Sequence, residues 1–148
     1  MKLGLPPIPE LAGPLPLGAA ALLALNDHLL KAAFPGAITG KLSDLAGCFV
    51  LPLFLSAALA CATPWPRRRR LAIGAVVTAA AFAAVKLSAA AAGAVTAALD
   101  LATVPLLGAS NRIVVDPTDL VALPLVLAAF AWGARRPELG AGVEFTGR

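Results

Sequence analysis

Residues 45–88 read LAGCFVLPLFLSAALACAT, then PWP, then RRRR, then LAIGAVVTAAAFAAVKLS. The two apolar runs, 45–63 and 71–88, are each close to the length of about 20 residues that a helix needs to cross the hydrocarbon core of a bilayer. Pro64 and Pro66 end the first run, and the four arginines that follow are typical of a cytoplasmic loop, because such loops carry an excess of basic residues. The stretch therefore predicts two transmembrane helices joined by a cytoplasmic turn.

The composition of the whole chain agrees with this interpretation. Of 148 residues, 59% are hydrophobic and 14% are charged, and the mean hydropathy is +0.86. Soluble domains carry about 25% charged residues, so too little polar surface remains here to cover a soluble core. The net charge of +4 does not indicate nucleic-acid binding, because the basic residues cluster at the ends of apolar runs. Cys48 and Cys61 share one apolar run, and no disulfide framework is expected.

Four apolar runs predict an all-α fold, an integral membrane bundle of four transmembrane helices. They cover residues 15–34, 45–63, 71–88 and 119–134. Residues 1–14 should form an irregular or interfacial lead-in, and residues 135–148 a cytoplasmic tail. The third run stays apolar to Leu99, so this helix either tilts or breaks near Ser88 to Gly93. A signal peptide is a competing interpretation of the first run, but polar residues occupy the place where its cleavage site should lie.

Two arginine clusters predict the orientation of the helices. If Arg67 to Arg70 are cytoplasmic, the second helix runs inward and the third runs outward. The fourth then ends inward, which agrees with Arg135 and Arg136 directly after it. Both termini are therefore expected in the cytoplasm. Pro52 and Pro124 should kink the second and fourth helices.

The other ionisable residues fall on the opposite, extracytoplasmic side in this topology. Charged groups in or near the bilayer are costly, so they are normally paired, turned inward or functional. A proton-transfer or catalytic role is the hypothesis for Asp27, His28, Asp44 and Asp119. A ligand-binding role is the hypothesis for Asn26, Lys31, Lys41, Lys86, Arg112 and Asp116, whose cations could hold a phosphate or carboxylate. Neither a metal site nor a cofactor is predicted, since the single histidine has no partner at zinc-motif spacing.

Simpler structural roles explain some of these residues. Asp116 followed by Pro117 is a good start for the last helix, with Asp119 able to reach back to it. Thr39 or Ser43 could cap the second helix in the same way. Asp27 and Lys31 are four residues apart with the acid first, the favourable order for a helical ion pair.

The polar pattern resembles that of the VanZ-like membrane proteins, a family of small multi-helix bacterial proteins linked to glycopeptide resistance. The similar residues are Asp27, His28 and Lys31 in an early helix, and Arg112, Asp116 and Asp119-Leu120 at the start of the last helix. The chain departs from the family at Leu123, where an asparagine is usual, and at Lys86, where an acidic and an amide residue are usual. The resemblance implies a multi-pass protein of the bacterial plasma (inner) membrane with a role in the cell envelope.

Three classes of function remain open. The first is a site that binds or processes an anionic lipid or cell-envelope precursor, which leaves open whether the protein is an enzyme. The second is a non-catalytic structural subunit that forms a homo-oligomer or binds a membrane partner, as small residues in the third helix would allow. The third is a small transporter or proton pathway. It is disfavoured because Ser56 and Thr78 are almost the only polar residues in the inner half of the last three helices.

Overall fold

The computed structural model describes residues 8–34, 36–108 and 112–136. The regular elements in this part of the chain are all helical, which confirms the all-α class. They are α1 (Pro14–Leu25), the π-helical turn η1 (Asn26–Leu30), α2 (Lys31–Ala33), α3 (Ala37–Ala62), α4 (Arg67–Leu87), α5 (Ala89–Leu107), the 3-10 helix η2 (Pro117–Ala122) and α6 (Pro124–Arg135). Residues 1–7 of the expected lead-in and 137–148 of the expected tail lie outside the described residues.

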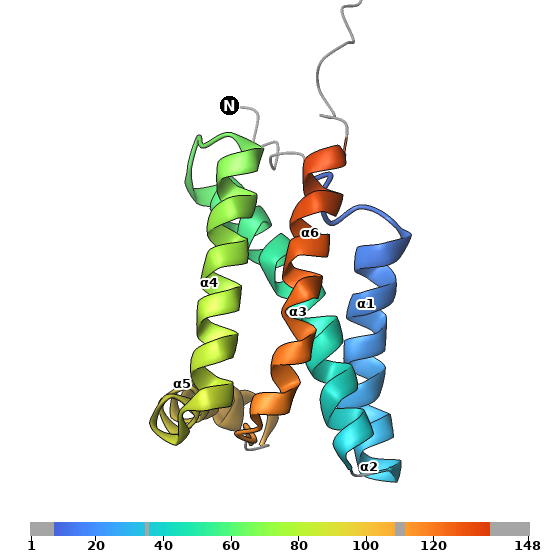
Figure 1. The fold of residues 1–148 in the computed structure, drawn as a ribbon, viewed down its shortest axis with the longest axis vertical. Helices are drawn as coiled ribbons and strands as arrows, with labels where there is room; N and C mark the ends of the chain where they lie inside the picture. The colour runs from blue at the N-terminus through green and yellow to red at the C-terminus, as the bar shows by residue number, and fades with distance from the viewer. Residues whose placement is uncertain (1–7, 35, 109–111, 137–148) are drawn as a thin grey trace, which may run out of the picture.

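Helix α3 is the centre of the bundle. It packs against α1, α4 and α6, and α4 also packs against α6. Figure 1 shows these four helices running along the long axis of the molecule, with the arginine-bearing ends of α4 and α6 at the same end. Where α3 and α4 meet, Gly74 lies so close to the backbone of Pro52 that a β-carbon on Gly74 would come within 2.5 Å of the Pro52 carbonyl oxygen. Glycine therefore permits this helix contact.

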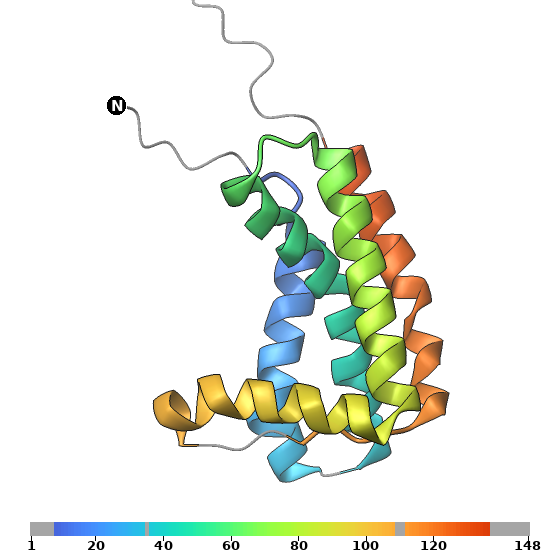
Figure 2. The same cartoon turned by 90° about the vertical axis from the view of Figure 1, so that its left-hand side faces the viewer.

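Of the two alternatives for the third apolar run, a tilted helix or a broken one, the structure has the break. Helix α4 ends at Leu87, Ser88 adopts an extended backbone conformation, and α5 begins at Ala89. The Ser88 hydroxyl accepts a hydrogen bond of 3.3 Å from the amide of Ala91 and so caps α5. Figure 2 shows the result: α5 turns away from the direction of α4 and lies across the end of the bundle.

The second helix begins earlier than the sequence predicted. Helix α3 starts at Ala37 instead of about residue 45, and its N-cap is Gly36 with no side-chain cap. Thr39 and Ser43 are therefore helical residues and not caps, which corrects that expectation. The Thr39 hydroxyl instead lies 3.1 Å from the Phe34 carbonyl oxygen and 3.0 Å from that of Gly36. Lys41 and Asp44 project from the same helix.

The last helix is built in two parts. Asp116 caps η2 by accepting a hydrogen bond of 2.9 Å from the amide of Thr118, which confirms its predicted capping role. Pro124 occupies the first turn of α6 and does not interrupt it, so the predicted kink becomes a junction between the 3-10 helix and the α-helix. The sequence predicted that the Asp119 side chain would reach back to the start of this helix. That contact is not found, because the Asp119 carboxylate binds two lysines.

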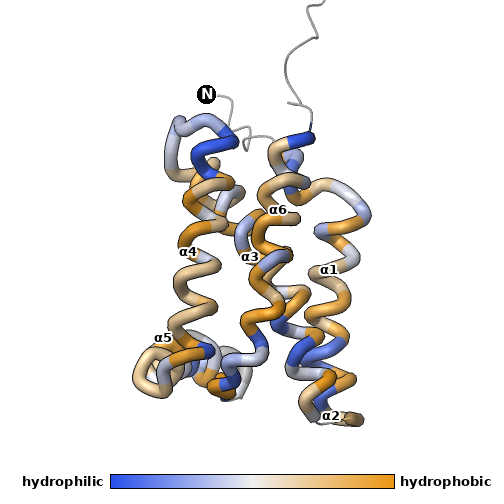
Figure 3. Tube along the Cα trace, viewed as in Figure 1, coloured by the Kyte–Doolittle hydropathy of each residue, from blue (hydrophilic) through white to orange (hydrophobic). Residues whose placement is uncertain are grey.

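Three helical stretches are long and apolar enough to cross a membrane by length and composition, namely Ala37–Ala62, Arg67–Leu87 and Pro117–Arg135. Large apolar side chains face outward, with Ile38 84% and Leu127 71% exposed, while the polar Asn26 and Ser56 are 0% exposed. Figure 3 shows apolar residues along the lengths of the helices and hydrophilic residues gathered toward the two ends. This distribution indicates a membrane protein.

Candidate functional site

Two charged residues at the end of the bundle opposite the arginines are nearly buried. Lys86, near the end of α4, and Asp119, in η2, are each 6% exposed. Lys86 is the cation of the two. Its ammonium group donates hydrogen bonds to the carboxylates of Asp44, at 2.8 Å, and Asp119, at 2.7 Å. Lys86 thereby links α4 to both α3 and η2, and each of the two carboxylates has a cationic partner.

Lys41 extends this network toward the surface. Its ammonium group lies 2.6 Å from the second carboxylate oxygen of Asp119 and 2.7 Å from the Thr118 hydroxyl. Asp119 thus bridges two lysines, one nearly buried and one about one-third exposed. The Thr118 hydroxyl and amide donate hydrogen bonds to Asp116, and together they lower the pKa of that carboxyl below its ordinary value. Asp116 therefore stays ionised at neutral pH.

A second polar chain connects the first helical segment to α3. The buried Asn26 side chain donates hydrogen bonds to the Thr39 carbonyl oxygen, at 2.7 Å, and to the Ser43 hydroxyl, at 2.6 Å. Ser43 in turn donates to Asp27, at 2.7 Å, and Asp27 pairs with Lys31 at 2.6 Å, as predicted from their spacing. Asn26 and Asp27 belong to the π-helical turn η1, and such turns are frequent at functional sites.

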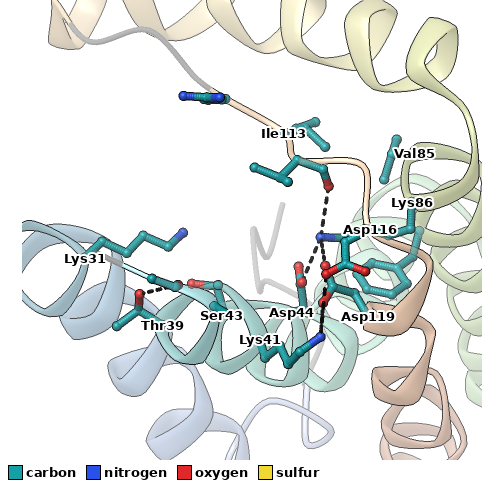
Figure 4. Close-up of a pocket in the computed structure, with 16 residues that line it drawn as sticks. Lys31, Thr39, Lys41, Ser43, Asp44, Val85, Lys86, Ile113, Asp116 and Asp119 are labelled. Atoms are coloured by element: carbon teal, nitrogen blue, oxygen red, sulfur yellow. Dashed lines mark hydrogen bonds and ion pairs between the residues drawn. The ribbon is translucent and has the colours of Figure 1, made fainter. Parts of the chain in front are cut away.

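A pocket of about 760 Å³ lies between these two polar groups. Its charged lining comprises Lys31, Lys41, Asp44, Lys86, Arg112, Asp116 and Asp119, and Thr39 and Ser43 add polar atoms. Figure 4 shows Lys31 on one side of the pocket, with Asp44, Asp119 and Lys86 converging on the other. Four cations from four separate parts of the chain therefore meet around one space. We call it the polar pocket.

Two predicted site residues stand apart from the network. Arg112 lines the polar pocket and is exposed, and it makes no hydrogen bond or ion pair with the residues that the structure describes. His28 is exposed on η1 and is not part of the pocket lining, although Asp27 beside it joins the polar chain through Ser43. The geometry thus brings the predicted cations together and leaves the predicted histidine outside.

Catalysis has weaker geometric support than binding. Within the described ranges, no group of three His, Cys, Asp or Glu side chains is arranged to hold a metal ion. The Ser43 and Thr118 hydroxyls each donate a hydrogen bond of 2.7 Å directly to a carboxylate, with no histidine between them to act as a general base. What the arrangement can do with its described side chains is hold an anion by charge and hydrogen bonds.

One buried polar residue at the other end of the bundle, Glu10, was not predicted from the sequence to have a role. Glu10, in the segment before α1, is 0% exposed and accepts hydrogen bonds from the Ser56 hydroxyl, at 2.9 Å, and from Arg70, at 3.4 Å. The Trp132 indole donates to the Glu10 backbone oxygen at 3.3 Å. The only sequence signal was an isolated acid in a proline-rich apolar segment, which by itself does not reveal its partners.

Comparisons with protein-family models, curated proteins and solved structures gave no match. The resemblance to VanZ-like proteins therefore stays a prediction, and the geometry of the polar pocket alone guides the assignment of function.

Proposed function

We propose that this chain is a multi-pass protein of the bacterial inner membrane whose polar pocket binds the anionic headgroup of a lipid or cell-envelope precursor on the extracytoplasmic side. This proposal adds one span to the three candidate spans described above. The added span comes first along the chain and is the segment Pro14–Ala33. Its elements of 12, 5 and 3 residues follow one another without a gap, and together they approach the length of about 20 residues that a span requires.

The positive-inside rule supports the orientation. Arg67 to Arg70 and Arg135 lie at one end of the bundle, and the polar pocket lies at the other. If the arginine end is cytoplasmic, the pocket faces outward and both termini lie in the cytoplasm. Lysines also occur at the pocket end, but there they are paired with carboxylates, so their net charge is small.

The unpaired Arg112 carries the proposal for an anionic ligand. The carboxylates of the pocket are already paired with lysines, whereas the Arg112 guanidinium has no described acceptor. A guanidinium matches the geometry of phosphate and carboxylate oxygens. Lys31 and Lys41, each partly exposed, add further positive charge around the same space. A phosphate that enters the pocket would meet donors on several sides.

A structural subunit remains the second candidate, because one observation favours it. The lysines and aspartates of the network satisfy one another, as expected if they only hold the helices together. A purely structural network does not require a pocket of about 760 Å³ beside it, whereas a binding site does. We therefore place the binding function first.

The test compares phosphatidic acid with diacylglycerol of the same acyl chains, added to the full-length protein in detergent and measured by native mass spectrometry. We expect the phosphate-bearing lipid to bind better and Arg112→Ala to weaken that binding about tenfold, the loss of one charged hydrogen bond. Arg68→Ala is the matched control, since Arg68 is exposed at the other end of the bundle. Equal binding of the two lipids, or an Arg112→Ala protein that binds like the unaltered chain, would contradict the proposal.

A further inference from the structure

A second cavity, of about 480 Å³, lies at the arginine end of the bundle. It is lined by Leu15, Phe49, Ala128, Ala131, Trp132, Arg135 and Arg136. Helices α1 and α6 both pack on α3 but make little contact with each other, and the cavity opens where they part. We call it the arginine groove. It shares no lining residue with the polar pocket.

The arginine groove has an apolar part and a basic part. Leucine, phenylalanine and alanine side chains form an apolar part, and two arginines at the end of α6 form a basic part. The guanidinium of Arg136 stacks over the Trp132 ring at 3.7 Å from its centroid, which fixes its position. An apolar channel that ends in positive charge is complementary to a molecule with a hydrocarbon chain and an anionic head.

The two arginines have hydrogen-bonding capacity left for such a head. Arg135 is exposed and has no ion-pair partner among residues 8–34, 36–108 and 112–136. The Nε of Arg136 is buried and lacks a hydrogen-bond acceptor in the same part of the chain. A buried donor without an acceptor is unfavourable. The exposed Arg135 guanidinium is the one that a phosphate can reach directly, and phosphate oxygens are the acceptors that guanidinium groups bind best.

We propose that the arginine groove binds an anionic phospholipid of the leaflet that surrounds it. An acyl chain lies against the apolar lining, and the phosphate sits beside Arg135 and Arg136. Basic pockets between transmembrane helices bind anionic headgroups, and tryptophan is enriched at the headgroup level. The site is independent of the polar pocket, because it uses other residues at the other end of the bundle.

Photo-crosslinking in vesicles tests this site directly. The full-length protein is reconstituted in phosphatidylcholine with a small fraction of phosphatidylglycerol that carries a diazirine in one acyl chain, and crosslinked peptides are identified by mass spectrometry. We expect crosslinks on the α6 peptide with Ala128 and on peptides with Leu15 or Phe49. The same probe with a phosphocholine head should give about 25-fold fewer of them, since each of the two groove arginines favours anionic lipid by about fivefold.

Paired variants separate a bound lipid from lipid that merely surrounds the protein. Ala128→Leu narrows the groove and should remove most groove crosslinks, whereas Ala80→Leu on the exposed face of α4 should not. Arg135→Ala should lower the preference for phosphatidylglycerol about fivefold, whereas Arg68→Ala, the same charge change outside the groove, should leave it unchanged.

Two results would overturn the inference. One is groove crosslinking that is equal for both headgroups and insensitive to Ala128→Leu and Arg135→Ala. The other is groove crosslinking that Ala80→Leu and Arg68→Ala lower as much as Ala128→Leu and Arg135→Ala do. Variants that fold poorly are identified by size-exclusion chromatography and circular dichroism of the purified protein, and Arg112→Ala should leave groove crosslinking intact.

Discussion

Lys86 illustrates, at the scale of single residues, how a charge is held in an apolar bundle. A lysine on the third apolar run could in principle snorkel toward water. Lys86 instead turns inward, with its side chain 8% exposed, and meets Asp44 and Asp119 on neighbouring elements. Its desolvation is offset by two short ion pairs, so removing either partner leaves charge uncompensated in a nearly buried place.

Two ion pairs of similar length should therefore differ in energy. Lys86 and Asp44 are 2.8 Å apart with side chains 8% and 19% exposed, and Lys31 and Asp27 are 2.6 Å apart with side chains 44% and 41% exposed. A double-mutant cycle of Lys86→Met and Asp44→Ala should give a coupling energy of about 1–3 kcal/mol in the free energy of unfolding. The matched cycle of Lys31→Met and Asp27→Ala should give less than about 1 kcal/mol. Denaturant titration in detergent measures both, and equal coupling would show that burial does not control these pairs.

Gly74 gives a second prediction at this scale. A β-carbon there would come within 2.5 Å of the Pro52 backbone oxygen, which cannot rotate away. We expect Gly74→Ala to lower the free energy of unfolding by about 1–3 kcal/mol, because α3 and α4 must move apart. Gly93→Ala is the control, since no atom lies within 4 Å of that position, and it should stabilise α5 by up to about 1 kcal/mol. Equal thermal stability of the two variants would contradict the close contact.

At the scale of elements, the break between α4 and α5 determines how the chain is arranged at the end of the bundle that carries the polar pocket. The extended backbone at Ser88 stops α4, and the Ser88 hydroxyl begins α5 in a new direction. Without this break the apolar run would continue as one helix beyond the bundle. The break lets α5 lie across the end, as Figure 2 shows, and lets the chain return toward η2 beside Lys86.

The cap at Ser88 is testable by hydrogen exchange. Ser88→Ala removes the acceptor of the Ala91 amide and should cost about 1 kcal/mol of local helix stability. The first turn of α5 should then exchange about fivefold faster, while the middle of α4 stays unchanged. Ser88→Thr keeps a capping hydroxyl and should exchange like the unaltered chain. Unchanged exchange in Ser88→Ala would mean that the backbone conformation alone starts α5.

At the scale of the whole molecule, the two ends of the bundle differ in how their charges are used. The arginine end carries exposed basic residues and the buried pair of Glu10 with Arg70. The other end carries the polar pocket, where lysines and aspartates are interleaved. Large apolar side chains are exposed between the ends. This separation agrees with the positive-inside rule, by which basic residues gather in the loops on one side of the membrane.

Thiol labelling in intact cells tests the proposed orientation. Single cysteines at Arg112→Cys and Arg68→Cys, in a chain with Cys48→Ala and Cys61→Ala, place one exposed thiol at each end of the bundle. A membrane-impermeant maleimide should label the first from outside and reach the second only after the cells are permeabilised. Labelling of Arg68→Cys in intact cells would reverse the orientation, and with it the side on which the polar pocket opens.

The sequence by itself determined the all-α class and the membrane character, because apolar run length and composition depend only on local residues. It also determined the Asp27–Lys31 pair and the Asp116 cap, since both act within one turn. The start of α3 was misplaced because the predicted helix was the apolar run, which begins only at Leu45. Lys41 and Asp44 precede that run but lie on the face of the helix that meets other charged elements.

Only the tertiary structure decided which distant residues meet. Lys86 contacts an aspartate 42 positions away and another 33 positions away, and Glu10 meets Ser56 across 46 positions. Such pairs depend on how the helices pack, and nothing in the local pattern encodes which helix faces which. The exclusion of His28 from the polar pocket, and the lack of an acceptor for the Arg112 guanidinium among the described residues, are decided in the same way. The composition therefore indicates that lipid surrounds the helices, and the packing of α3 against its neighbours forms the polar pocket.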